Sequence, residues 1–427
     1  MKILSINLKD RRYRMKKLDQ QLINCLAAYR SGRRPAAYVG LDKEDWQQLY
    51  QLARMHKLKA VTCETMWGIP EFCSGNQALA AVWQRESILE TVGQAQRTSA
   101  LLLVTQALER GGIQYAVVKG AVCRELYPQP DLRPSGDEDI LIHPADLEKC
   151  SELFRQEKLT LFQAKEGDPV THWADKQTGL HIELHTALLS GDRAEEKLLN
   201  RFFSEQLAHT VSIHIQNRTV ATLPPTYHFL FLVCHALKHF ISGGFGIRTV
   251  CDVVAYAERY AEEIDKETVY GWLDAIRGRI FLDQLFAIGS NYFDFDIAAN
   301  GWTLSSPPNE TEMLEDIMDA GIYGQSSMSR RHSAGIVLQA VENKSNQASA
   351  LSAAFPSRQK LLGRYPVLKR APMLLPACWA HRLGKYAIEV LWTYRSGNSP
   401  LKSVEMAKKR TEMMVKYGVF PKDQKKN

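Results

Sequence analysis

Apolar residues at helical spacing dominate the first hundred residues of the chain. After Asp42, with Asp45 three positions later as a capping partner, one helical face carries Trp46, Leu49, Ala53 and His56. This pattern predicts a packed amphipathic helix. Residues 77–110 contain helix-forming residues with few breakers, and two glycines follow them. We therefore expect a long helix that ends at residue 110 and delivers the chain to a different kind of structure.

Short β-branched and apolar runs replace the helical spacing between residues 111 and 222. The runs that predict strands are 114–119, 137–142, 160–164 and 179–188. Gly120 opens a short helical stretch after the first strand, and residues 145–159 predict a helix between the second and third strands. The order of these elements indicates a small mixed α/β unit.

After residue 223 the helical pattern returns and continues to the end of the chain, with breaker-rich joints at 304–308 and 324–333. We therefore predict an α+β fold that is predominantly helical, with a small strand–helix–strand core flanked by N-terminal and C-terminal helical segments. The expected divisions are an N-terminal helical region, the α/β core, a helical segment packed on that core, a linker with helices, and a basic helical region: 1–110, 111–222, 223–300, 301–354 and 355–427.

Composition favours a soluble protein. Hydrophobic residues make up 45% and charged residues 24% of the chain, and no uninterrupted apolar run reaches the roughly 18 residues of a membrane-spanning helix. The N-terminus lacks the apolar region of a secretory signal, and the eight dispersed cysteines form no C-x-x-C pair. We therefore expect a cytoplasmic protein. The net charge is +7, and residues 355–427 carry 16 Lys and Arg against 4 Asp and Glu, so the basic charge belongs to the C-terminal region.

Three carboxylates predict a metal site. Asp137 and Asp139 alternate along one predicted strand, so their side chains point to the same face. Two magnesium ions about 3.5–4 Å apart require such flanking oxygen ligands. Glu183 lies on the polar face of a later strand, and it can serve as a third ligand or as a general base. One of its flanking histidines, His181 or His185, is expected to orient it.

Phosphate binding is predicted beside these carboxylates. Gly120 follows a strand and begins a helix, where backbone N–H groups favour an anion. Lys119 adds a positive charge there, and Arg133 is a second cation for a triphosphate oxygen. A lysine pointing into solvent at the end of a strand explains Lys119 equally well.

The strand ending in Lys119–Gly120, the following Arg133 and the acidic run with Asp137 and Asp139 resemble the polymerase-beta-like nucleotidyltransferase superfamily. They are most similar to its family of uncharacterised bacterial nucleotidyltransferases, over residues from about 41 to 418. The resemblance implies Mg²⁺-dependent (or Mn²⁺-dependent) transfer of a nucleoside monophosphate from a nucleoside triphosphate, with release of pyrophosphate. It leaves the acceptor open: a small molecule, a sugar, a peptide or a protein side chain.

A histidine-containing helix after residue 223 belongs to the same resemblance. In it Lys238 and His239 are interpreted as contacts to phosphate or acceptor, in preference to zinc ligands, while core histidines remain a strong alternative. Arg248 and Asp252, four residues apart, are compatible with a simple helix-stabilising pair.

Glu138, between the two aspartates, is the weak point of the assignment. By alternation it faces the apolar side, where a charge is costly unless it is paired. Either Glu138 lies at the exposed end of the strand, or a one-residue shift of register makes it the ligand.

Two further hypotheses remain open. The first is a catalytically degenerate protein that binds nucleotides or a protein partner. It is favoured by Glu138 and by Ala121, which follows Gly120 where the superfamily usually has serine. The second assigns the main function to the basic C-terminal region, through contact with nucleic acid or an anionic membrane. A solvated helical face explains that region more simply.

Overall fold

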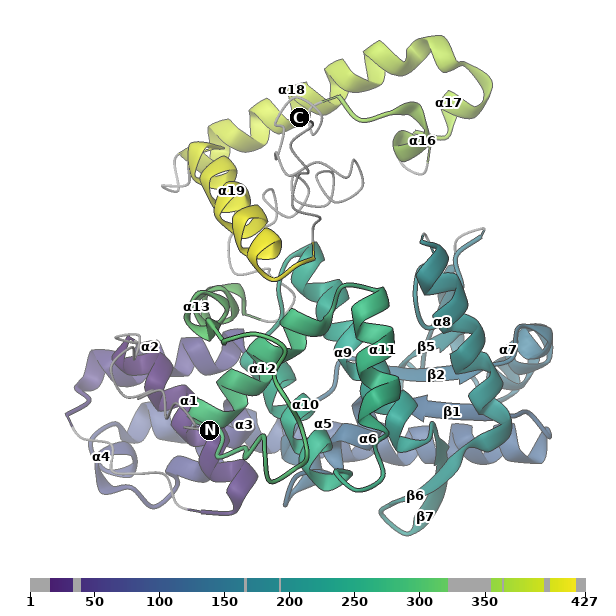
Figure 1. Cartoon of the computed structure of the whole chain (residues 1–427). Coiled ribbons are helices and arrows are strands. Elements are labelled where there is room, and N and C mark those ends of the chain that lie inside the picture. Colours follow the sequence, from purple (N-terminus) through teal and green to yellow (C-terminus); the bar gives the residue numbers. More distant parts are fainter. Residues whose placement is uncertain are drawn as a thin grey trace, which may run out of the picture. The chain divides into compact units, whose positions relative to one another are not determined.

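The computed structural model describes most of the chain and divides it into two units (Figure 1). The described residues are 16–33, 40–164, 167–191, 193–321, 355–362, 365–394 and 400–419. The first unit contains the chain up to His235 together with Ile247–Leu314, and the second contains Ala236–Gly246 together with the residues from Glu315 onward. The predicted joint at 304–308 is irregular, whereas the one at 324–333 lies outside the described residues.

A five-stranded mixed sheet forms the strand-rich part of the first unit. Its strands in spatial order are β1 (Tyr115–Val118), β2 (Glu138–Ile142), β5 (His181–His185), β4 (Val170–Ala174) and β3 (Thr160–Ala164). β2 pairs with β5 in parallel, and the other neighbours are antiparallel. A separate hairpin joins β6 (Val211–Ile215) to β7 (Arg218–Thr222). A small mixed sheet within a mostly helical chain confirms the predicted α+β class.

Helices precede, interrupt and follow the strands along the chain. Those before the sheet are α1 (Lys17–Ser31), α2 (Lys43–Met55), α3 (Lys59–Met66), α4 (Pro70–Cys73) and α5 (Gln77–Arg110). Those within the strand-rich part are α6 (Gly120–Arg124), α7 (Leu147–Gln156) and α8 (Ala194–Glu205). Those after it are α9 (Pro225–Ser242), α10 (Ile247–Arg259), α11 (Lys266–Ala275), α12 (Arg279–Tyr292) and α13 (Glu310–Ala320). Of these, α9 and α13 extend into the second unit.

The long helix α5 links the N-terminal helices to the sheet, as its predicted position required. It packs against α3 near its start and against α7 and β7 near its end, and Figure 1 shows it running from the N-terminal helices towards the strands. Trp83 of α5 makes ring contacts with Phe72 and Tyr50 in a buried cluster. The predicted helix cap is also present, because the Asp42 side chain accepts from the backbone N–H of Asp45 in a capping box.

The second unit is helical wherever the structure describes it beyond residue 315. It contains α16 (Arg358–Leu361), α17 (Val367–Arg370), α18 (Leu375–Tyr394) and α19 (Pro400–Lys416). Leu361, Leu368 and Cys378 form a small buried cluster there. The Arg410 side chain is buried and lies 3.3 Å from the carboxylate of Asp316. Among the described helices of the whole chain, none has the length and apolar character needed to span a membrane.

Candidate active site

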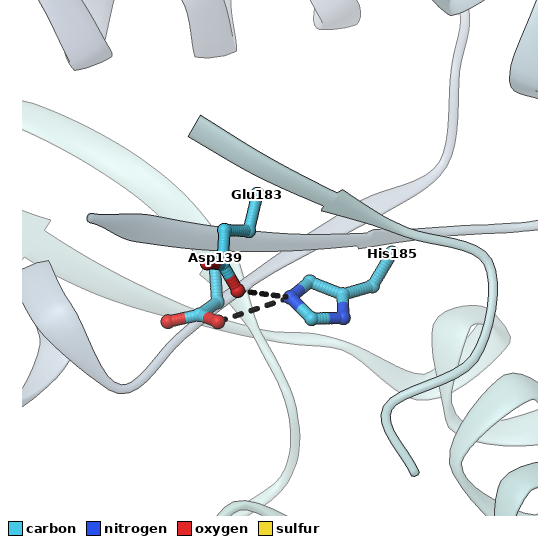
Figure 2. Close-up of side chains that lie close together, drawn as sticks. All are labelled: Asp139, Glu183 and His185. Atoms are coloured by element: carbon cyan, nitrogen blue, oxygen red, sulfur yellow. Dashed lines mark hydrogen bonds and ion pairs between the residues drawn. The ribbon is translucent and has the colours of Figure 1, made fainter. Parts of the chain in front are cut away.

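The register of β1, β2 and β5 brings two of the predicted carboxylates, Asp139 and Glu183, together on one face of the sheet. Asp139 is the Cα partner of Val118 in β1 and of Glu183 in β5. Adjacent residues on paired strands point to the same face, so Asp139 and Glu183 lie side by side. His185, two residues after Glu183, shares that face. Figure 2 shows the three side chains converging.

Asp139 is the buried centre of this cluster, with 1% of its side chain exposed. Its Oδ2 lies 3.0 Å from the Lys119 ammonium, and its Oδ1 lies 3.0 Å from Nε2 of His185. The same Nε2 lies 3.6 Å from Oε2 of Glu183, while Oε1 of Glu183 lies 3.5 Å from Nδ1 of His172. The structure therefore places His185, not His181, between the two carboxylates.

Asp139, Glu183 and His185 each offer one ligand atom, and these atoms lie within 4.8 Å of one another. Two carboxylates and one imidazole suit a divalent cation: oxygen donors fit Mg²⁺, and Mn²⁺ also accepts imidazole nitrogen. Asp137, which precedes β2, is outside this group. Its contact with the cluster runs through Lys119, whose ammonium lies 3.5 Å from Oδ1 of Asp137.

The charges of the cluster shift one another's proton affinities. Burial alone would raise the pKa of Asp139, but the positive charges of Lys119 and His185 hold it well below its ordinary value. The pKa of Asp137 is raised, chiefly by burial and then by the neighbouring carboxylates. Burial would lower the pKa of His185, yet its hydrogen bonds to Asp139 and Glu183 raise it to about 9. A site that separates the pKa values of nearby acids is typical of catalytic centres.

The turn that carries Lys119 is held by a histidine that sequence reasoning did not select. Lys119 has φ 60° and ψ −107°, a backbone conformation that is unusual for any residue except glycine. Its N–H donates to Nε2 of His228 at 2.9 Å, so Nδ1 of His228 carries the proton. His228 is buried on α9. The only sequence signal was a histidine in an apolar helix, and that helix drew attention to Lys238 and His239 instead.

The neutral state of His228 predicts a loss of stability in mild acid. Burial lowers its pKa to about 3 in the folded protein, whereas the unfolded chain has a pKa of about 6.5. The unfolded state therefore binds the proton first as the pH falls. Between pH 6.5 and 5 we expect His228 to reduce the free energy of unfolding by about 1.5–2 kcal/mol.

Urea unfolding of the wild-type protein and of His228→Gln at both pH values measures this difference. The glutamine variant should lose less stability on acidification. His214→Gln, which changes an exposed histidine, is the matched control and should behave as wild type. Equal acid sensitivity of His228→Gln and wild type would contradict the assignment.

Glu138 is buried and paired, which resolves its place in the strand. It is 2% exposed and points away from the aspartates, as alternation requires. Its carboxylate accepts from the guanidinium of Arg124, from the hydroxyl of Ser135, and from the N–H of Ala121 at 2.7 Å. Of the two registers considered, the structure therefore has the one in which Asp139, and not Glu138, faces the cluster. Glu138 instead links β2 to α6 through its hydrogen bonds.

The Glu138 carboxylate leaves no room for a side chain at residue 120. A Cβ atom at residue 120 would lie 2.2 Å from Oε2 of Glu138, so only glycine fits there without displacement. The Ala121 N–H at the start of α6, which was predicted to favour a phosphate, is hydrogen-bonded to Glu138. Close packing against Glu138 therefore explains the glycine at residue 120 without any bound ligand.

Arg133 lies in a buried ion pair away from the three-residue cluster. Its Nε and Nη2 donate to the two carboxylate oxygens of Asp252 at 2.8 and 2.6 Å, and Tyr127 donates to the same carboxylate at 2.7 Å. Burial opposes the charge on Arg133, but the Asp252 carboxylate raises the pKa of the guanidinium well above its ordinary value. The predicted pairing of Asp252 with Arg248 gives way to this bidentate pair.

Lys238 and His239 lie on the part of α9 that belongs to the second unit. Lys238 is exposed and His239 is half-buried. Their predicted contact with a substrate therefore stays a prediction.

Comparison with known proteins identifies the family of this chain. Residues 42–288 match the model of a family described as uncharacterised nucleotidyltransferase, and the chain belongs to that family. A solved structure, the antigenic nucleotidyltransferase-like protein from Paracoccidioides brasiliensis, is 15% identical, with a TM-score of 0.29. That match covers 45% of this chain and 92% of the other. No curated protein matches the chain.

Proposed function

We propose that this chain is an active nucleotidyltransferase, which transfers a nucleoside monophosphate from a nucleoside triphosphate to an acceptor and releases pyrophosphate. The observation that carries the proposal is the pairing of Asp139 with Glu183 on adjacent strands, beside Lys119. Membership in the nucleotidyltransferase family supports it.

A divalent cation fits the donor set of Asp139, Glu183 and His185, and Asp137 contacts the Lys119 ammonium beside this set. Such an ion, Mg²⁺ or Mn²⁺, would supply charge stabilisation at the α-phosphate. The role of the protein would be to position this ion and to keep Asp139 ionised. The Lys119 ammonium favours the ionised form of Asp139, whereas His185 would have to give up its proton to offer a nitrogen to the ion.

Glu183 is the carboxylate best placed to meet the acceptor. Its side chain is 28% exposed, whereas that of Asp139 is 1% exposed. In the proposed reaction an acceptor oxygen attacks the α-phosphorus and gives its proton to Glu183. The bond from the α-phosphorus to the bridging oxygen breaks, and pyrophosphate leaves with the electron pair.

Two arginines lie beside the turn that leads into Asp137. Arg248 donates to the carbonyl of Pro134, and Gln94 accepts both from Arg97 and from the N–H of Ser135, each at 2.9 Å. Arg97 and Arg248 therefore both lie at the turn that leads into Asp137. Guanidinium groups bind phosphate oxygens with good geometry, so we assign them the triphosphate in place of the buried Arg133.

Calorimetry with ATP, GTP, CTP and UTP, with and without Mg²⁺, tests binding. Incubation of the protein with labelled nucleotides and lysate from its source then tests for a labelled acceptor and for pyrophosphate release. We expect Mg²⁺-dependent binding of at least one nucleotide and a label that EDTA abolishes. The absence of any Mg²⁺-dependent binding would refute the proposal. Binding without label or pyrophosphate would assign a non-catalytic nucleotide-binding role.

A further inference from the structure

Lys119 is fixed at the active site by its backbone. It follows β1 directly and precedes α6, in a backbone conformation with φ 60° that few residues adopt. The hydrogen bond from its N–H to buried His228 holds this turn in place. The side chain is 17% exposed and extends along the sheet edge to the aspartates. The turn fixes where the Lys119 side chain begins, and ion pairs with the two aspartates hold its ammonium in one place.

That place lies between the two aspartates. The ammonium is 3.0 Å from Oδ2 of Asp139 and 3.5 Å from Oδ1 of Asp137. A cation that contacts one oxygen from each aspartate occupies the position that a second metal ion needs in a two-metal site, where the ions lie about 3.5–4 Å apart. The two alternating aspartates thus already share one positive charge, which the chain supplies.

The two oxygens of Asp139 divide the site into halves. Oδ2 faces Lys119, and Oδ1 faces His185 with Glu183 beside it. Asp139, Glu183 and His185 supply the group of ligand atoms that suits a metal ion, and Asp137 is not part of it; Oδ1 is the Asp139 oxygen that contacts His185. A second divalent ion on the Oδ2 side would meet the ammonium at a few ångströms, and like charges at that distance repel strongly in a buried site.

We propose that Lys119 replaces the second metal ion, so that the site holds one divalent cation, bound by Asp139, Glu183 and His185. The inference rests on the proposed function, because it describes how that active site binds metal. In the transfer step the lysine ammonium stays on the protein and offers a fixed charge to the phosphate oxygens that border Asp137. Asp137 acts as the partner that positions Lys119, and not as a metal ligand.

Counting bound Mn²⁺ tests this inference. Dialysed protein is titrated with Mn²⁺, and the free ion is measured by its electron paramagnetic resonance signal. We expect one bound ion per chain in the wild type and in Asp137→Asn, with affinities within about threefold of each other. Glu183→Gln should weaken binding by about tenfold or more, by analogy with the loss of a metal-supporting group. In Lys119→Met the aspartate pair is freed, and we expect a second ion to bind.

Lys158→Met is the matched control for Lys119→Met. Lys158 also has a positive φ, of 65°, but it is exposed and lies in the turn after α7, so the count should stay at one. Two ions in the wild type, or a count of one in Lys119→Met that is folded by circular dichroism, would overturn the inference. Loss of the single ion in Asp137→Asn would also overturn it. A wild type that binds no Mn²⁺ would instead refute the proposed function itself.

Discussion

Replacing Asp139 with asparagine is expected to lower pyrophosphate release by about 10³-fold, which corresponds to about 4 kcal/mol of transition-state stabilisation. Asparagine keeps the shape of the side chain and removes its negative charge. Asp139 is the residue that contacts both Lys119 and His185, so the substitution disconnects the two halves of the site. Because the substitution also removes a negatively charged metal ligand, the affinity for Mn²⁺ should fall as well.

The fold should tolerate this change, so the loss can be read as a catalytic effect. Lys119 retains Asp137 as a partner at 3.5 Å. His185 loses the carboxylate that raises its pKa and can become neutral, so no uncompensated charge is left buried. Rates of pyrophosphate release and circular dichroism spectra give the comparison. Asp294→Asn, at a carboxylate that is 78% exposed, is the control. An Asp139→Asn protein that keeps more than about a tenth of the activity would exclude Asp139 from the mechanism.

Strand alternation and an α/β order of elements were sufficient to predict that Asp139 and Glu183 come together. Asp139 and Glu183 have a polar position on strands with apolar neighbours, and a period of two residues fixes the face of each side chain. The sequence also predicted that one histidine beside Glu183 orients it. The sequence could not say which histidine this is. The pairing of β2 with β5 decides it, because His185 is the one that contacts Asp139.

The partners of the buried charges could not be predicted from the sequence. Arg133 and Asp252 are separated by 119 residues, and the pairing that local spacing favoured was the one between Arg248 and Asp252. Glu138 and Arg124 are closer in sequence but lie on different elements. In each case the tertiary packing brings the groups together, and an isolated charge at an apolar position indicates only that some partner exists.

Strands β4, β6 and β7 were missed, and their burial patterns are weak, although β3, which is exposed along its whole length, was predicted. In β6 most side chains are exposed, and in β4 only Trp173 is fully buried. Edge and hairpin strands of this kind lack the apolar alternation that identifies a half-buried strand. β1 and β2, by contrast, are buried along their whole length, and their continuous apolar runs were sufficient to locate them.

Removing the carboxylate of Glu138 is expected to produce the largest loss of stability. Arg124 is 1% exposed and Glu138 is 2% exposed, so Glu138→Ala would leave a buried guanidinium without its counter-charge. Breaking one side of such a pair costs about 3–5 kcal/mol. The Ala121 N–H would also lose its acceptor, which adds to the cost. We expect the midpoint of urea unfolding to fall accordingly.

A double-mutant cycle separates the pair from the loss of packing. In Glu138→Leu with Arg124→Met both charges disappear together, so the double variant should be less destabilised than the sum of the two single variants by about 2 kcal/mol or more. Ser135→Ala removes a neutral hydroxyl that donates to Glu138 and accepts from Arg124, while both charges remain, and it should cost about 1 kcal/mol. Additive effects of the two substitutions would show that the charges do not depend on each other. Because Glu138 also holds the start of α6 beside Lys119, variants of Glu138 that still fold should bind Mn²⁺ and nucleotide more weakly than Ser135→Ala does.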